Sequence, residues 1–157
     1  MFSGCSKSQG EFATGTIQHM TQLSMYEMEN GSYKWEVKAA EAIIRGTDER
    51  ALLTKPVMKF YKDGKVISVV KSQKGMLFPE TKDIDLKDDV FVETISDGSV
   101  LRGKTLHFSS SQNKIWSKDP VILDRSGTKI NGAGFTAKPD LSEIIIEKQE
   151  TVFSGKS

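Results

Sequence analysis

The chain has 157 residues, with 22 Lys and Arg against 21 Asp and Glu, and an apolar fraction of 37%. This length suits one domain with one core, and the charge balance excludes the basic excess of a nucleic-acid-binding protein. Within these residues no run of about 18 apolar residues encodes a transmembrane helix.

The first residues predict a lipid anchor. Small residues precede the single cysteine, Cys5, as they do at the cleavage site of a bacterial lipoprotein, so we expect Cys5 to carry lipid. The charged and apolar parts of a signal peptide are missing from the sequence, and a free thiol is the alternative. Residues 6–15 are rich in Ser, Lys, Gly and Gln, so residues 1–16 are predicted to be a tether and possible anchor region, whereas residues 17–157 are predicted to form the folded domain.

Four turn signals recur along the folded part. Asparagine or aspartate followed by glycine supplies the positive φ angles of a two-residue hairpin turn, and serine–glycine is a looser relative. The pairs recur about every thirty residues, at 30–31, 63–64, 97–98 and 126–127. We therefore expect stacked units, each made of two hairpins with four short strands.

Alternation of apolar and polar residues supports strands between these turns. Met58 and Phe60 flank Lys59, and Ile84 and Leu86 alternate with charged residues, which is typical of an antiparallel sheet with one buried face. Residues 35–44 have helical propensity, but the repeat places a strand there. The predicted fold class is all-β and antiparallel.

A complete P-loop pattern, G-x-x-x-x-G-K-T, occurs at residues 98–105. A P-loop needs a helix after it so that the helix N-terminus faces the phosphates. Residues 106–111 alternate and then break, which does not open a helix. We therefore expect no nucleotide site, and a nucleotide-binding enzyme is the least favoured function.

The remaining chemical signals are sparse. His19 and His107 fall on unrelated segments without a Cys/His cluster, so neither a metal nor a cofactor is expected. Asp83 and Asp85 share one face of a strand, where Lys82 and Lys87 fit an ordinary solvated surface. No Ser, Thr or Cys has a recognisable nucleophile setting, and we do not expect an enzyme.

Five segments form an ordered series along the chain: ENGSYKWEVKA at 29–39, PVMKFYKDG at 56–64, TKDIDL at 81–86, DDVFV at 88–92 and SGTKING at 126–132. Together, over roughly residues 17–153, this series resembles the LptC family, the periplasmic, membrane-anchored component of the lipopolysaccharide export bridge. Related LptA/OstA-like domains share the repeat.

The resemblance implies a β-jelly-roll shaped like a twisted open boat that holds the acyl chains of lipopolysaccharide. It implies that the N-terminal edge meets a transporter's jelly roll and that the C-terminal edge meets an LptA-like protein. It implies a periplasmic protein anchored to the inner membrane. Ser6, which follows the cysteine, is not the residue expected for a lipoprotein retained in the inner membrane, so anchoring in the outer membrane is the alternative. Gly31, Gly127 and Gly132 match the family's turn and close-approach glycines, where a bulky residue should disturb a hairpin or an edge.

The leading hypothesis is a non-enzymatic lipid-transfer module with an apolar groove. The predicted lining residues are Met58, Phe60, Ile84, Leu86, Val90, Val92, Leu106, Phe108, Ile130, Phe135, Ile144 and Ile146. Two alternatives are an LptA-like soluble bridge component and a scaffold lipoprotein with a closed core.

Overall fold

The computed structural model describes residues 17–45, 50–148 and 150–153, and the predicted tether and Cys5 lie outside these residues. The described chain is all-β, as predicted, and every strand pairing in it is antiparallel. The strands are β1 (Ile17–Glu29), β2 (Ser32–Arg45), β3 (Ala51–Thr54), β4 (Val57–Lys62), β5 (Lys65–Lys71), β6 (Lys74–Phe78), β7 (Asp83–Thr94), β8 (Val100–Ser109), β9 (Lys114–Ser117), β10 (Val121–Arg125), β11 (Thr128–Gly132), β12 (Gly134–Ala137), β13 (Ile144–Glu147) and β14 (Glu150–Phe153).

Three of the four glycine turns are the two-residue hairpins that the sequence predicts. Asn30 and Gly31 have φ angles of 54° and 81°, and the pairs at 63–64 and 126–127 have nearly the same values. This conformation matches the twist of the flanking strands. The pair at 97–98 instead lies in a longer loop, residues 95–99, between β7 and β8.

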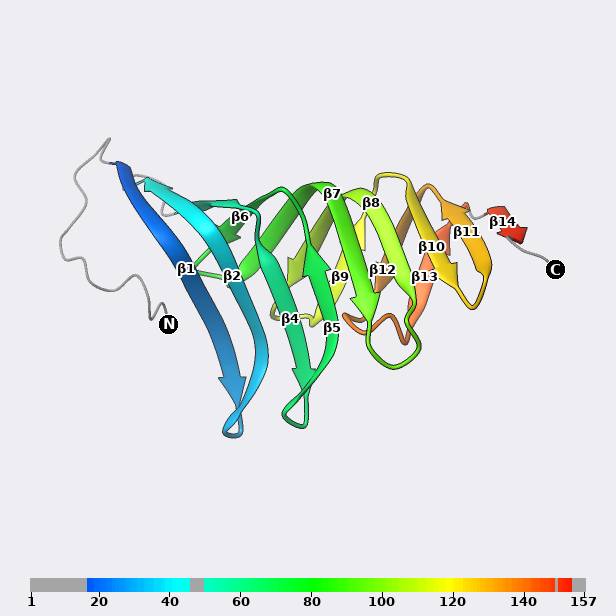
Figure 1. Cartoon of the computed structure of the whole chain (residues 1–157), viewed down its shortest axis with the longest axis horizontal. Coiled ribbons are helices and arrows are strands. Elements are labelled where there is room, and N and C mark those ends of the chain that lie inside the picture. Colours follow the sequence, from blue (N-terminus) through cyan, green and yellow to red (C-terminus); the bar gives the residue numbers. More distant parts are fainter. Residues whose placement is uncertain (1–16, 46–49, 149, 154–157) are drawn as a thin grey trace.

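One continuous sheet folds over to make two facing halves, and in Figure 1 the half with β4, β5, β10 and β11 lies in front of the half with β9, β12 and β13. We call them half-sheet A and half-sheet B. Half-sheet A follows the order 23–29, 32–38, β4, β5, 90–94, 100–103, β10, β11 and β14. Half-sheet B follows the order 17–21, 41–45, β3, β6, 83–87, 105–109, β9, β12 and β13.

The long strands β1, β2, β7 and β8 cross from one half-sheet to the other. β1 bends at Gln22, whose φ is 61°, and β7 bends at a bulge around Asp88 and Asp89, whose φ angles are 70° and 58°. A bulge inserts unpaired backbone and turns a strand sharply. The expected four short strands per unit are thus wrong in part, because segments 83–86 and 90–94 form one bent strand, as do segments 100–101 and 106–108.

The bends line up along one closed corner of the molecule. Backbone hydrogen bonds continue along it, from Lys55 N to Gln73 O (2.8 Å) and from Gln73 N to Asp88 O (2.9 Å). The hairpin turns lie at the opposite side, where the rims of the two half-sheets meet. We call that side the mouth.

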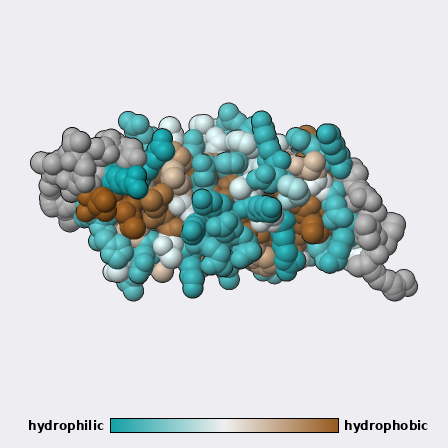
Figure 2. Space-filling view, turned by 90° about the horizontal axis from the view of Figure 1, so that it is seen from above, coloured by the Kyte–Doolittle hydropathy of each residue, from teal (hydrophilic) through white to brown (hydrophobic). Residues whose placement is uncertain are grey.

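The two faces of the sheet differ as alternation predicts. Side chains that point between the half-sheets form one apolar core, while the outward face is mostly hydrophilic, as the view in Figure 2 shows. In that view apolar side chains gather toward the N-terminal end, with a smaller patch toward the C-terminal end.

Residues 35–44 lie in β2, so the predicted strand is confirmed over the helical propensity of this segment. The P-loop pattern spans the β7–β8 loop and β8, and Gly103, Lys104 and Thr105 are strand residues. The described part of the chain contains no helix long and apolar enough to cross a membrane.

Candidate functional site

The structure gathers all twelve predicted lining residues between the two half-sheets. Three of them, Ile130, Ile144 and Ile146, are partly buried and pack against the core. The other nine are buried: Met58, Phe60, Ile84, Leu86, Val90, Val92, Leu106, Phe108 and Phe135. The interior is therefore a continuous apolar layer, closed at the corner by backbone.

Aromatic rings join the half-sheets at the N-terminal end of this layer. The ring of Phe108, from half-sheet B, lies 5.0 Å from that of Phe60 and 5.6 Å from that of Trp35, both from half-sheet A. Both contacts are edge-to-face, the arrangement that aromatic quadrupoles favour. Trp35 was not among the predicted lining residues, although its alternation with Val37 and Ala39 was a usable signal.

A polar cluster holds the mouth shut above these rings. Glu27, in β1, accepts hydrogen bonds from Trp35 Nε1 (2.7 Å) and from Ser110 Oγ (2.8 Å), which follows β8. Burial alone would raise the pKa of the Glu27 carboxyl, but these two hydrogen bonds and the charges of Lys34 and Lys82 bring it below its ordinary value. Glu27, Trp35 and Ser110 form the N-terminal clasp.

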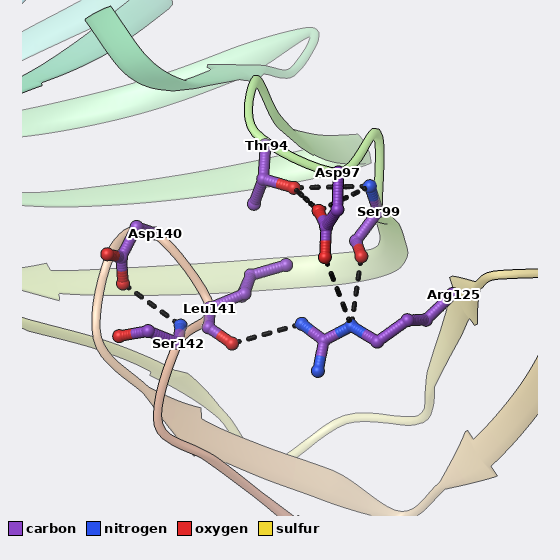
Figure 3. Close-up of polar contacts among 7 residues, drawn as sticks. All are labelled: Thr94, Asp97, Ser99, Arg125, Asp140, Leu141 and Ser142. Carbon is purple, nitrogen blue, oxygen red and sulfur yellow. Dashed lines mark hydrogen bonds and ion pairs between the residues drawn. The ribbon is translucent and has the colours of Figure 1, made fainter.

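A second cluster holds the mouth at its C-terminal side, where the loop of residues 138–143 reaches half-sheet A. Ser68 Oγ donates to Pro139 O at 2.8 Å, and Leu141 of the loop is fully buried. Arg125 links this loop to the β7–β8 loop, because Nη2 donates to Leu141 O (3.0 Å) and Nε to Ser99 Oγ (2.9 Å), as Figure 3 shows. Ser68, Ser99, Arg125, Pro139 and Leu141 form the C-terminal clasp.

Asp97 adds charge to this clasp. Hydrogen bonds from the Thr94 hydroxyl and from Ser99 lower the pKa of Asp97 to about 2, with a smaller contribution from Arg125, whose Nε lies 3.8 Å from Asp97 Oδ2. In the loop itself, Ser142 N donates to Asp140 Oδ1 at 2.9 Å. Burial would raise the pKa of Asp140, but this bond and the charge of Lys62 hold it below its ordinary value.

Between the clasps a cavity of about 300 Å³ opens at the mouth. Phe60 and Ile67 supply its apolar lining, and Lys34, Lys62 and Lys138 are its cationic residues. Glu29 and Asp140 are the carboxylates in the lining, so cations outnumber anions there. The cavity therefore connects solvent to Phe60, one of the three packed aromatic residues.

The three predicted glycines lie in two different structural settings, hairpin turns and a close approach between strands. Gly31 and Gly127 have φ angles of 81° and 82° at hairpin turns, with open space where a Cβ would stand. Gly132 lies against β13, and a Cβ there would clash with Ile146 Cγ2. A larger residue would therefore strain the backbone at Gly31 and Gly127, whereas at Gly132 it would crowd the neighbouring strand.

The polar residues weighed in the sequence have structural partners. His19 and His107 lie on the outward face, with His107 Nδ1 2.7 Å from Asp85 Oδ1. Asp83 accepts a bond from Ser110 N, so Asp83 and Asp85 have partners more specific than the expected lysines. Among the described residues no group of three or more His, Cys, Asp and Glu side chains is arranged to hold a metal ion.

Comparison with known proteins gives one family match and a weak structural likeness. Residues 14–151 match the family model described as "LptC: Lipopolysaccharide-assembly, LptC-related". A solved structure, LptH, the LptA homologous periplasmic component of the conserved lipopolysaccharide transport device from Pseudomonas aeruginosa, is 12% identical, with 90% of this chain and 96% of that chain covered and a TM-score of 0.37. No curated protein matches the chain. The structural likeness is too weak to carry an argument, whereas the family match spans most of the chain.

Proposed function

The chain belongs to the LptC-related family of lipopolysaccharide-assembly proteins, and from that premise we propose that it carries lipopolysaccharide acyl chains between its two half-sheets. It would receive the lipid from an inner-membrane transporter and pass it to an LptA-like bridge protein. The observation that supports this most directly is the single apolar layer that contains all twelve predicted lining residues. Acyl chains need a dry apolar surface and no covalent chemistry.

The mouth cavity is the proposed access route. A lipid with phosphates on its sugar head and several acyl chains would place its anionic groups near Lys34, Lys62 and Lys138, while a chain enters past Phe60. The core side chains already pack closely, so the half-sheets must separate for a chain to enter. The clasps at either side of the cavity are the contacts that would have to yield.

The two ends of the sheet are the proposed docking edges. Among the described strands, β1 pairs with β2 alone, β13 with β12 alone and β14 with β11 alone. Such edges offer unpaired peptide groups to another strand. We assign the β1 edge to the transporter and the β13–β14 edge to the LptA-like protein, with a periplasmic location and anchoring through Cys5.

Photo-crosslinking in cells tests the interior route. A crosslinking amino acid at Phe60 or Phe108 should capture lipopolysaccharide, while one at Lys59, the outward neighbour of Phe60, should not. Capture from Lys59 but not from the two inward positions would contradict the proposal.

A scaffold with a permanently closed core is the second candidate. It is favoured by the close packing of Trp35, Phe60 and Phe108 in the described structure. A disulfide across the mouth separates the two candidates. It is introduced by Ser68→Cys and Pro139→Cys, because Ser68 and Pro139 are in hydrogen-bond contact. If the protein carries lipid, locking the mouth should abolish lipid capture by a crosslinker at Phe60. If the protein is a scaffold, the locked protein should still support lipopolysaccharide export in cells.

A further inference from the structure

The outward face of half-sheet B carries a row of apolar side chains that is separate from the core. Ile43, Leu52 and Met76 stand directly opposite one another on β2, β3 and β6. Ile43 is 38% exposed, and the other two are half-buried. Adjacent strands lie about 4.8 Å apart, so the row is a narrow strip perpendicular to the strands.

This strip lies in a groove of about 530 Å³, within the range of about 300–1,000 Å³ that holds small ligands. The row continues in register from Met76 to Asp85 and His107 on β7 and β8. Asp85 and His107 bond each other at 2.7 Å, and Trp116 stacks on the His107 ring at 4.3 Å. The groove is therefore apolar over β2, β3 and β6, and the hydrogen-bonded pair of Asp85 and His107 bounds it on β7 and β8.

Two lysines flank the apolar strip. Lys74 and Lys87 stand directly opposite each other on β6 and β7, on the same outward face, and both line the groove. Like charges in directly opposed positions destabilise a sheet. Neither lysine takes part in any ion pair formed among residues 17–45 and 50–148.

Two carboxylates near the groove are already engaged. Asp85 is held by His107, and Asp119 accepts a hydrogen bond from Thr105, which also lines the groove. An anion between Lys74 and Lys87 would therefore relieve their repulsion without displacing an existing partner, and an acyl chain attached to it would cover Met76, Leu52 and Ile43.

We propose that this groove binds a single-chain anionic amphiphile, with its phosphate between Lys74 and Lys87 and its chain along Met76, Leu52 and Ile43. The site lies on the opposite face of the sheet from the interior. It goes beyond the proposed function, since a chain bound here need not pass through the mouth.

The probe is dodecyl phosphate below its micelle concentration, with binding measured by calorimetry and by two-dimensional NMR of the protein. We expect saturable binding with shifts at β3, β6 and β7. The Lys74→Gln, Lys87→Gln double variant should bind about tenfold more weakly or worse, because each lost lysine removes a charge-assisted contact. Leu52→Gln should weaken binding by a similar factor.

Controls separate this site from general attraction. Lys59→Gln, an exposed lysine of half-sheet A, should leave dodecyl phosphate affinity unchanged. Dodecyl maltoside, which has the chain without the charge, should bind at least tenfold more weakly.

Four results would overturn the proposal. They are equal effects of Lys59→Gln and the double variant, equal affinity for dodecyl maltoside, binding only to anionic vesicles but not to the monomeric amphiphile, and shifts confined to interior residues. Failure of lipid capture at Phe60 would instead bear on the proposed function alone, because that side chain faces the interior.

Discussion

The two clasps hold the same mouth shut but fasten different kinds of structure. The N-terminal clasp joins Glu27 and Trp35, which are strand residues, to Ser110, the residue that follows β8, directly above three packed rings. The C-terminal clasp fastens the loop of residues 138–143 through Arg125 and Ser68. Regular strands over a filled core resist local opening more than a loop does, so the mouth should open from its C-terminal side.

The largest expected effect comes from removing the ring beneath the N-terminal clasp. Phe108→Ala should lower the free energy of unfolding by about 3–5 kcal/mol, because it leaves a cavity between the half-sheets and loses two ring contacts. Urea unfolding measures this. Phe91→Ala, on the outward face of the neighbouring strand β7, is the matched control and should cost clearly less. Equal losses would mean that the rings do not join the half-sheets.

The next effect comes from the clasp itself. Glu27→Ala should cost about 1–3 kcal/mol, because Trp35 Nε1 and the Ser110 hydroxyl lose their acceptor in a part-buried place. Glu29→Ala, on an exposed residue of the same strand, is the control for a lost carboxylate. Urea unfolding that shows no difference between the two variants would remove Glu27 from the clasp.

Arg125→Ala should cost only about 1 kcal/mol, since the side chain is partly exposed and makes contacts to a loop. Its main result should be local. Hydrogen exchange at Leu141, whose amide donates to Lys138 O at 2.8 Å, should accelerate much more than exchange in β1 or β2. Arg102→Ala is the control, because this arginine lies over Phe91 on the outward face. Uniform acceleration across the sheet would contradict a separately opening C-terminal side.

The smallest effect is a dependence on acid. Because the pKa of Asp97 falls from an ordinary 3.8 to about 2 on folding, its ionised form favours the folded chain. Its contribution is complete above the unfolded pKa and is lost as the pH falls through the folded one. Between pH 4 and 2, exchange at Leu141 should therefore rise in the natural chain more than in Asp97→Asn. Parallel pH profiles would show that Asp97 does not stabilise the C-terminal clasp.

The sequence was sufficient for the parts of this fold that depend on neighbours along the chain. Alternation around Met58 and Phe60 and the glycine turns at 30–31 and 63–64 predicted strands and hairpins, because side-chain period and positive φ are local properties. The bends were not predictable in this way. Gln22, Asp88 and Asp89 adopt positive φ without being glycine, since tertiary pairing at the corner fixes them.

The clasps were missed for the same reason. Glu27 and Ser110 are separated by 83 positions, and Ser68 and Pro139 by 71, and neither pair has a local pattern. Only the folding of half-sheet B over half-sheet A brings these residues together. The apolar core residues could be predicted as a set, whereas the polar residues of the two clasps could not.

The bend of β1 at Gln22 has a consequence for solubility. An exposed edge strand commonly recruits extended segments of other chains, and a straight edge of thirteen residues would be an aggregation hazard. A straight incoming strand can follow β1 on one side of the bend and must leave it on the other. Addition along the whole edge requires a strand that turns at the same place. The bend therefore limits how far a straight strand can pair along this edge, and full-length pairing is geometrically possible only for a strand with a matching bend.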